Sequence, residues 1–212
     1  LGQVSSMSLD NQRNLKLAIH SDPMFLRVAE RVAEEMNKWS TEFFGRKIVA
    51  DCRKELSFTT KIFRARGLHL HDRHIRDSNG VALAASIVDT TLYVVNNYQA
   101  LSDQGASIVL YLPKIQTAEE AAVWNELLTS LEKHLGLSVG TIKVYLLVEQ
   151  LEATHQLMEI RAVLGQHFVG YNTGRWDYIN SVSDAMAWDK SFVNPDIEAV
   201  TMTYGYMRHY EN

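Results

Sequence analysis

The sequence predicts an α/β fold built on a parallel sheet, and three observations support this prediction. Apolar, β-branched runs recur along the 212-residue chain, and several are apolar at every position, which is typical of strands buried on both faces. Helical patterns alternate with these runs. No Pro/Gly/Ser-rich linker divides the chain. One domain over residues 1–212 is therefore expected.

Three helices are expected from apolar periodicity and from end signals. The first covers Asp22–Trp39, where an Asp-Pro start precedes apolar residues spaced three and four positions apart. The second begins at Thr117 with the capping-box pattern Thr-Ala-Glu-Glu and ends near Gly136. The third covers Ala153–Gly165.

Six runs are expected as strands: Thr60–Phe63, Ala85–Val95, Ser107–Leu112, Thr141–Val148, His167–Tyr171 and Ala199–Thr203. Both a (β/α) barrel and an open doubly wound sheet fit this order. No GxGxxG or GxxxxGK[ST] motif follows a run, which disfavours a nucleotide-binding open sheet. A closed (β/α)8 TIM barrel needs eight strands, so the barrel is predicted to be incomplete in this chain.

Composition excludes several classes of function. The formal net charge of −4 gives no general attraction to nucleic acid or to an anionic membrane. No apolar run approaches the roughly 20 residues of a membrane span, and the first twenty residues are too polar for a signal peptide. A cytoplasmic protein without nucleic-acid or membrane partners is therefore expected.

Polar side chains follow three of the predicted strands. Arg64 comes after the first run, Glu149 after the fourth, and Asp177 after the turn that ends the fifth. In an α/β barrel the active site forms at the carboxyl ends of the strands, where two carboxylates could share Mg²⁺ and an arginine could stabilise a developing negative charge. Solvated or capping carboxylates are the commoner role of such residues, so the pattern alone leaves both interpretations open.

Four stretches resemble one enzyme family in order and in spacing. The most specific is HFVGYNTGRWDYI at 167–179, which is similar to the malate synthase signature H-x-x-G-L-N-x-G-R-W-D-Y-I. GTIKVYLLVE at 140–149 resembles G-T-I-K-A-T-V-L-I-E. YLPK at 111–114, with its following Glu-Ala and Trp-Asn pairs, and RARGLHL at 64–70 resemble Y-L-P-K…E-A-x-x-W-N and R-P-R-G-W-H-L.

The resemblance implies a Mg²⁺-dependent acyltransferase of the glyoxylate bypass, which condenses glyoxylate with acetyl-CoA to give malate and CoA. Arg64 matches the catalytic arginine of the family, and Glu149 and Asp177 match its two magnesium ligands. The substrate-binding positions implied are Arg64, Glu149, Gly174, Arg175, Trp176 and Asp177. A peroxisomal or glyoxysomal location is implied if the source is a eukaryote, and the oligomeric state is not predicted.

The sequence also departs from the family pattern, at Ala65, Leu68, Gly165, Tyr171, Asn180 and Gly205. Family members are much longer, and the aspartate that acts as their base is expected beyond Asn212. Two alternatives remain: a hydroxyacyl-CoA lyase of the citrate-lyase β-subunit type, or a non-catalytic remnant of the barrel. A zinc site at His69, His71 and His74 is a further, weaker interpretation.

Overall fold

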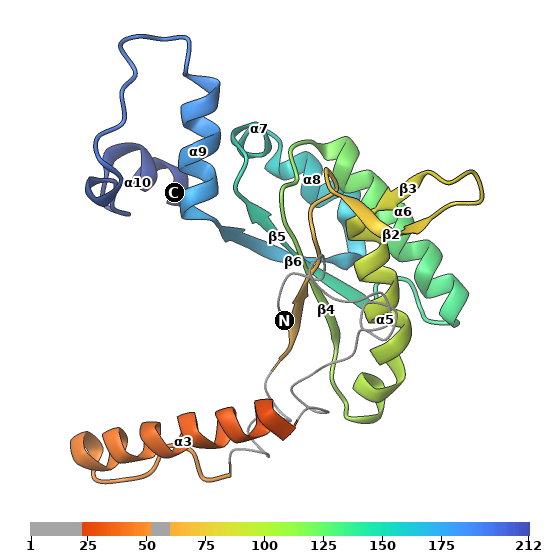
Figure 1. Cartoon of the computed structure of the whole chain (residues 1–212), viewed down its shortest axis with the longest axis vertical. Coiled ribbons are helices and arrows are strands. Elements are labelled where there is room, and N and C mark those ends of the chain that lie inside the picture. The colour runs from red at the N-terminus through yellow and green to blue at the C-terminus, as the bar shows by residue number, and fades with distance from the viewer. Residues whose placement is uncertain (1–22, 52–59) are drawn as a thin grey trace.

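A four-stranded parallel sheet forms the centre of the molecule in the computed structural model, which describes residues 23–51 and 60–212 (Figure 1). Asp22, the expected cap of the first helix, lies outside these residues. The strands occur in the order β1 (Ile62–Arg64), β4 (Ile108–Leu112), β5 (Ile142–Val148) and β6 (Phe168–Thr173). Each neighbouring pair is parallel, so the carboxyl ends of all four strands lie along one edge of the sheet.

Helices cover one face of this sheet. α5 (Ala85–Asp103), α6 (Ala118–Leu135) and α8 (Leu157–Leu164) lie to the same side of the strands in Figure 1. In the main core these helices pack against every second residue of the strands. In β5 the core residues are Ile142, Val144, Leu146 and Val148. The intervening residues of each strand therefore face the other way, toward what would be the interior of a barrel.

The described strands do not close into a barrel, which confirms the predicted α/β class with an incomplete TIM barrel. Within residues 23–51 and 60–212 no helix combines the length and the apolar character needed to cross a membrane. A hairpin of β2 (His71–Arg76) and β3 (Ala82–Ala84) lies between β1 and α5 in the chain.

Two strand predictions are wrong. The run Ala85–Val95 is the first half of the helix α5, whose 19 residues exceed the usual length of a strand. Its pattern misled because the buried face includes polar Ser86, Asp89 and Thr90, which interrupt the apolar periodicity of a helix. The run Ala199–Thr203 contains the end of η3 (Ile197–Ala199) followed by turns, because no strand among residues 23–51 and 60–212 pairs with it and β propensity alone is weak.

The three predicted helical regions are helical, but the first extends to Phe44 and the third is divided into two helices. The Thr117 side chain accepts a hydrogen bond from the Glu120 amide (3.3 Å), and Gly136 caps the end of α6 in the left-handed conformation (φ 69°). The helix expected at Ala153–Gly165 is split into α7 (Leu151–Thr154) and α8, and η2 (Gly165–His167) then leads into β6.

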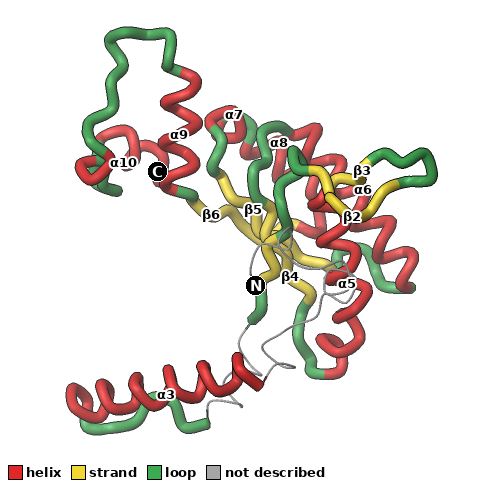
Figure 2. The backbone as a smooth tube through the Cα atoms, in the orientation of Figure 1, coloured by secondary structure: helices red, strands yellow, loops and turns green. Residues whose placement is uncertain are grey.

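The first expected helix is α3 (Pro23–Phe44), and Figure 2 shows it well separated from the sheet. Its apolar stripe is exposed and includes Val28, Val32, Met36, Trp39 and Phe43. At the other end of the chain, α9 (Arg175–Ala185) and α10 (Gly205–Glu211) build a second small core with Val200.

Candidate functional site

Four polar residues meet at the carboxyl edge of the sheet. Arg64 is the last residue of β1, Lys114 lies two residues beyond β4, Glu149 directly follows β5, and Asp177 lies in the first turn of α9, after β6. Each strand of the parallel sheet therefore contributes one residue. The structure brings together the three residues that the sequence selected and adds Lys114 to them.

Glu149 is the most buried of the four, with 0% of its surface exposed. Its Oε1 accepts a hydrogen bond from the Lys114 amide (2.8 Å), whereas Oε2 is buried and no N–H or O–H group in the described residues donates to it. Gly174 makes this arrangement possible. A Cβ at that position would lie 3.0 Å from the Glu149 Cβ and 3.2 Å from Oε2.

Two cations face the carboxylates. The Lys114 Nζ lies 2.7 Å from the Asp177 Oδ1 and 3.9 Å from the Glu149 Oε1. The Arg64 Nη2 is also 3.9 Å from the Glu149 Oε1, and its guanidinium lies 5.7 Å from the centre of the Tyr111 ring. Half of the Arg64 side chain is exposed, so it can reach a ligand above the sheet edge.

The pKa values of the two carboxyl groups are shifted in opposite directions. Burial, followed by the hydrogen bond shared with Asp177, raises the pKa of Glu149 to about 7. The hydrogen bond with Glu149 and then the one from Lys114 lower the pKa of Asp177. The shared hydrogen bond requires the proton to be on Glu149, whereas ionised Glu149 leaves Oε2 with no donor. The more buried carboxyl group therefore holds the proton when no other cation compensates its charge.

This donor set fits Mg²⁺. Mg²⁺ binds through one or two protein carboxylates and fills its remaining positions with water and substrate oxygens. The pair Glu149 and Asp177 offers that number, and the unpaired Oε2 is an available ligand atom. Zinc is not supported: among the described residues, which include His69, His71 and His74, no three His, Cys, Asp or Glu side chains are grouped to hold a metal ion.

The remaining predicted site residues begin α9. Gly174 donates its N–H to the Tyr210 hydroxyl (2.8 Å) and to the Val148 carbonyl (3.3 Å). Arg175 donates to the Val200 carbonyl, and its guanidinium lies 4.4 Å from the Trp176 ring. The Arg175 side chain therefore fixes α9 to the following segment, and it does not point into the site.

Trp176 is 48% exposed, which excludes the role of an ordinary core tryptophan. The amides of the first helical turn have no partner within the helix, so the start of α9 offers N–H groups to an anion beside the two carboxylates.

Sequence reasoning missed the position of Lys114. It was not among the site residues that the sequence selected, but its ammonium lies within 4 Å of both carboxylates. The strand order explains this position: β4 lies between β1 and β5, so a residue that follows it enters the same edge. Tyr210, whose hydroxyl donates to the Val148 carbonyl, was also missed.

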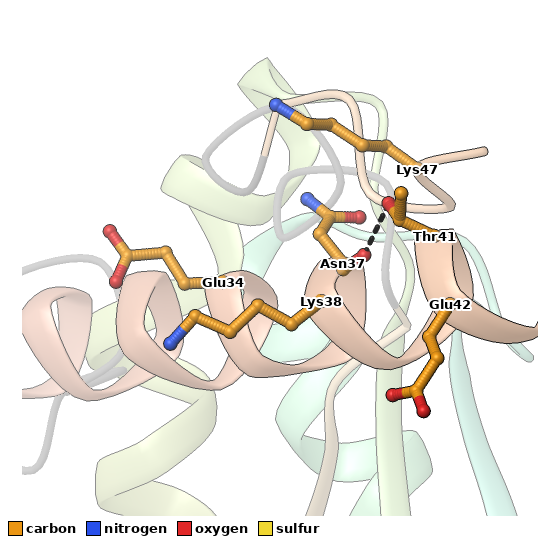
Figure 3. A pocket seen from close by; sticks show the side chains of 6 residues that line it. All are labelled: Glu34, Asn37, Lys38, Thr41, Glu42 and Lys47. Atoms are coloured by element: carbon orange, nitrogen blue, oxygen red, sulfur yellow. Dashed lines mark hydrogen bonds between the residues drawn. The ribbon is translucent and has the colours of Figure 1, made fainter. Parts of the chain in front are cut away.

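A separate surface pocket has no part in this site. Figure 3 shows its six lining residues, which belong to α3 and the loop after it: Glu34, Asn37, Lys38, Thr41, Glu42 and Lys47. The pocket encloses about 590 Å³. Asn37 holds it together by accepting from the Val49 amide (2.9 Å) and donating to the Val49 carbonyl (2.7 Å). None of the predicted site residues lines it.

Comparison with known proteins agrees with the motifs. Residues 60–212 match the model of the malate synthase TIM barrel domain. Malate synthase A of Escherichia coli K12 is 43% identical over 149 residues, which are 70% of this chain and 28% of that protein. The bifunctional glyoxylate cycle protein of Caenorhabditis elegans is 42% identical over 147 residues (69% and 15%), and glyoxysomal malate synthase of Gossypium hirsutum is 37% identical over 156 residues (72% and 27%).

The chain thus spans less than a third of the length of these relatives. The family model nevertheless covers the whole sheet and all four polar residues at its edge. By this match and by the identities over some 70% of its length, the chain belongs to the malate synthase family, with residues 60–212 in the TIM barrel domain.

Proposed function

We propose that this chain supplies the glyoxylate and magnesium site of an enzyme that condenses glyoxylate with acetyl-CoA to give malate and CoA. One observation carries the proposal: a fully buried glutamate, whose Oε2 has no donor when the side chain is ionised, lies beside a second carboxylate and an arginine at the carboxyl edge of a parallel sheet. A buried carboxylate without a donor is unfavourable unless a cation compensates it. A functional ligand role explains why it is retained.

Glu149 and Asp177 would hold Mg²⁺, and the bound cation would polarise the aldehyde of glyoxylate. The Lys114 amide donates to Glu149 Oε1 and leaves Oε2 as the free ligand atom. Gly174 supports the same function, because its lack of a side chain leaves room for the carboxylate of Glu149.

The carboxylate of glyoxylate would bind at the start of α9. The amides of this first helical turn have no partners within the helix and lie at the positive end of the helix dipole. Trp176, exposed at the same turn, would cover one side of this small anion. Arg175 would contribute its backbone amide, since its guanidinium is bound to the Val200 carbonyl.

Arg64 would stabilise the oxygen that gains negative charge as the new carbon–carbon bond forms. Its guanidinium is a fixed donor that remains charged at all relevant pH values. The Tyr111 ring and Glu149 are its neighbours, at 5.7 Å and 3.9 Å, and both contacts favour this orientation of the guanidinium. Such donors are worth most in the transition state, where the charge develops.

The general base for the methyl group of acetyl-CoA is not assigned to a residue of this chain. Asp89 is fully buried and accepts hydrogen bonds from the Arg66 guanidinium at 2.7 and 2.8 Å, so it cannot serve as this base. A hydroxyacyl-CoA lyase would use a similar set of residues, and no observation favours it over the condensation.

Calorimetry tests the proposal on this chain. Mg²⁺ should bind weakly alone and several-fold more tightly with glyoxylate present, because substrate oxygens complete its coordination. Glu149→Gln removes one anionic ligand and should abolish most of the binding, whereas Glu126→Gln, at an exposed position on α6, should not change it. Equal Mg²⁺ affinity with and without glyoxylate would refute a shared site.

A cytoplasmic location, or a glyoxysomal one in a eukaryote, stays a prediction; the Gossypium hirsutum relative is named as glyoxysomal. Detection of malate and free CoA thiol, rather than malyl-CoA, would separate the condensing enzyme from the lyase.

A further inference from the structure

The side chain of Lys114 occupies the place between the two carboxylates that a bound cation would need. Its Nζ lies 2.7 Å from the Asp177 Oδ1 and 3.9 Å from the Glu149 Oε1. No other Lys or Arg in the described residues forms ion pairs within 4 Å with both carboxylates. Arg64 approaches Glu149 alone, and at the longer distance.

The backbone of Lys114 is also unusual. It is the one described residue other than glycine with a positive φ, at 61°. This left-handed conformation is disfavoured for a side chain with a Cβ. Here it accompanies two contacts from one residue: the amide donates to Glu149 (2.8 Å) and the ammonium reaches Asp177. The position is therefore shaped by this pair of carboxylates.

The two contacts differ in what would happen when a divalent cation binds. The amide contact uses Glu149 Oε1 and leaves Oε2 available, so it can persist. The ammonium uses an oxygen of Asp177 and a share of the charge of both carboxylates. An ammonium and a divalent cation cannot both lie between the same two groups, because like charges at contact distance repel strongly.

We propose that Lys114 is an internal cation that holds the carboxylate pair in the metal-free protein and leaves it when the divalent cation binds, so that ammonium and metal compete for one place. This inference rests on the proposed function, since it assumes that Glu149 and Asp177 are the metal ligands. Lys114 is 28% exposed, so its side chain has room to move outward. Metal binding is then an exchange of one cation for another. A cation lies beside Glu149 and Asp177 in the metal-free protein as well as in the metal-bound protein.

Lys114→Met tests the competition by calorimetry with Mg²⁺ alone. Removal of the ammonium should tighten Mg²⁺ binding roughly three- to tenfold, as expected for loss of a partly exposed charge-assisted pair. Methionine must still adopt φ 61°, so Lys114→Gly is the second variant: glycine takes that conformation freely and keeps the amide donor. Arg64→Gln is the matched control for charge, because it removes one cation near Glu149 but leaves the ammonium in place.

Both Lys114 variants should bind Mg²⁺ more tightly than Arg64→Gln does. Arg64→Gln itself should bind Mg²⁺ as tightly as wild type or slightly more tightly. Equal gains for Lys114→Met and Arg64→Gln would overturn the inference, since they would reflect net charge alone. Unchanged affinity in both Lys114 variants, with binding still abolished by Glu149→Gln, would overturn the inference and leave the metal site intact. No Mg²⁺ binding in the wild type would refute the proposed metal site itself.

Chemical labelling of lysines gives a second readout that does not depend on affinity. The rate at which an amine-reactive ester acylates Lys114 should rise several-fold at saturating Mg²⁺, because the ammonium is released from Asp177. Lys133, exposed near the end of α6, serves as the internal standard. The increase should disappear in Glu149→Gln. A rate at Lys114 that stays constant or falls when Mg²⁺ binds would show that the ammonium does not leave.

Discussion

Glu149→Gln should change how the stability of the metal-free chain depends on pH. In the folded protein the pKa of Glu149 is raised from 4.5 to about 7, chiefly by burial. The folded state therefore binds more protons than the unfolded state between about pH 4.5 and 7. The free energy of unfolding must fall as the pH rises through this window. Above pH 7, Glu149 is ionised in both the folded and the unfolded state, and the folded state bears the full free-energy cost of burying its charge.

The size of the effect follows from the shift. A rise of about 2.5 pKa units corresponds to about 3 kcal/mol at 1.36 kcal/mol per unit, and this is an upper value because Glu149 and Asp177 titrate together. Glutamine keeps an oxygen for the Lys114 amide and has no charge to bury. The variant should therefore be nearly flat from pH 4.5 to 7, and about 2–3 kcal/mol more stable than wild type at pH 8 without metal.

The shift of Asp177 does not cancel this effect. Its pKa is lowered, so the stability that it contributes is present above its ordinary value of 3.8 and is lost as the pH falls further. That loss occurs below the window in which Glu149 titrates. The two contributions can be separated by measuring unfolding from pH 3 to 8.

Urea unfolding in the presence of EDTA, at half-unit pH steps, is the assay. Glu126→Gln, which removes a carboxylate from an exposed position on α6, is the matched control and should follow wild type. A wild-type chain with no decline between pH 4.5 and 7 would refute the reasoning. So would a Glu149→Gln variant that declines as steeply as wild type, because another group would then be responsible.

Three further substitutions probe the supports of the site. Asp89→Asn should destabilise the chain by about 2–4 kcal/mol in urea unfolding, because it removes one charge from the buried pair with Arg66; a change below 1 kcal/mol would show that the pair is not needed. Gly174→Ala should weaken Mg²⁺ binding severalfold in calorimetry, since its Cβ would meet the buried glutamate at 3.0 Å, and unaltered affinity would contradict this. Thr117→Ala should lower the free energy of unfolding by about 1 kcal/mol through loss of the α6 cap, and an unchanged midpoint would exclude that role.

Much of the site could be predicted from the sequence because it depends on the direction of strands and little else. β4, β5 and β6 are short apolar runs with clear ends, and parallel strands bring the residues after those ends together. Glu149 and Asp177 could be selected on that basis alone. The resemblance to the family signature then favoured a metal-binding role for them over that of ordinary solvated carboxylates, which the pattern could not do.

Lys114 could not be placed in the same way. Its position depends on a left-handed backbone at a residue that carries a side chain, and sequence propensity argues against that conformation. The conformation follows from contacts with Glu149 and Asp177, 35 and more residues further along the chain. Contacts between distant residues decide such a position, and no local rule reports them.

The mistaken strand at Ala85–Val95 had a consequence for the chemistry as well as for the fold. As part of a strand, Asp89 could have faced the cavity and been a candidate base. As part of α5, it points to the segment that follows β1 and accepts from both the amide (3.0 Å) and the guanidinium of Arg66. Asp72, from the adjacent hairpin, binds the same guanidinium at 2.7 Å.

That buried cluster sets the direction of the chain two residues after Arg64. It fixes the carboxyl end of a strand of three residues, which has few ladder hydrogen bonds of its own to hold it. The buried polar residues of α5, which made its sequence resemble a strand, therefore include the aspartate that helps to hold Arg64, the proposed catalytic arginine, in position. Asp89→Asn should accordingly weaken the contact between Arg64 and Glu149 as well as the fold. The measurement is the acid limb of the stability of that variant. Arg64 helps to lower the pKa of Asp177, so a loosened Arg64 should bring that pKa back toward its ordinary value and reduce the stability that is lost as the pH falls below about 4. A loss as large as that of wild type would show that α5 stabilises the fold without positioning the site.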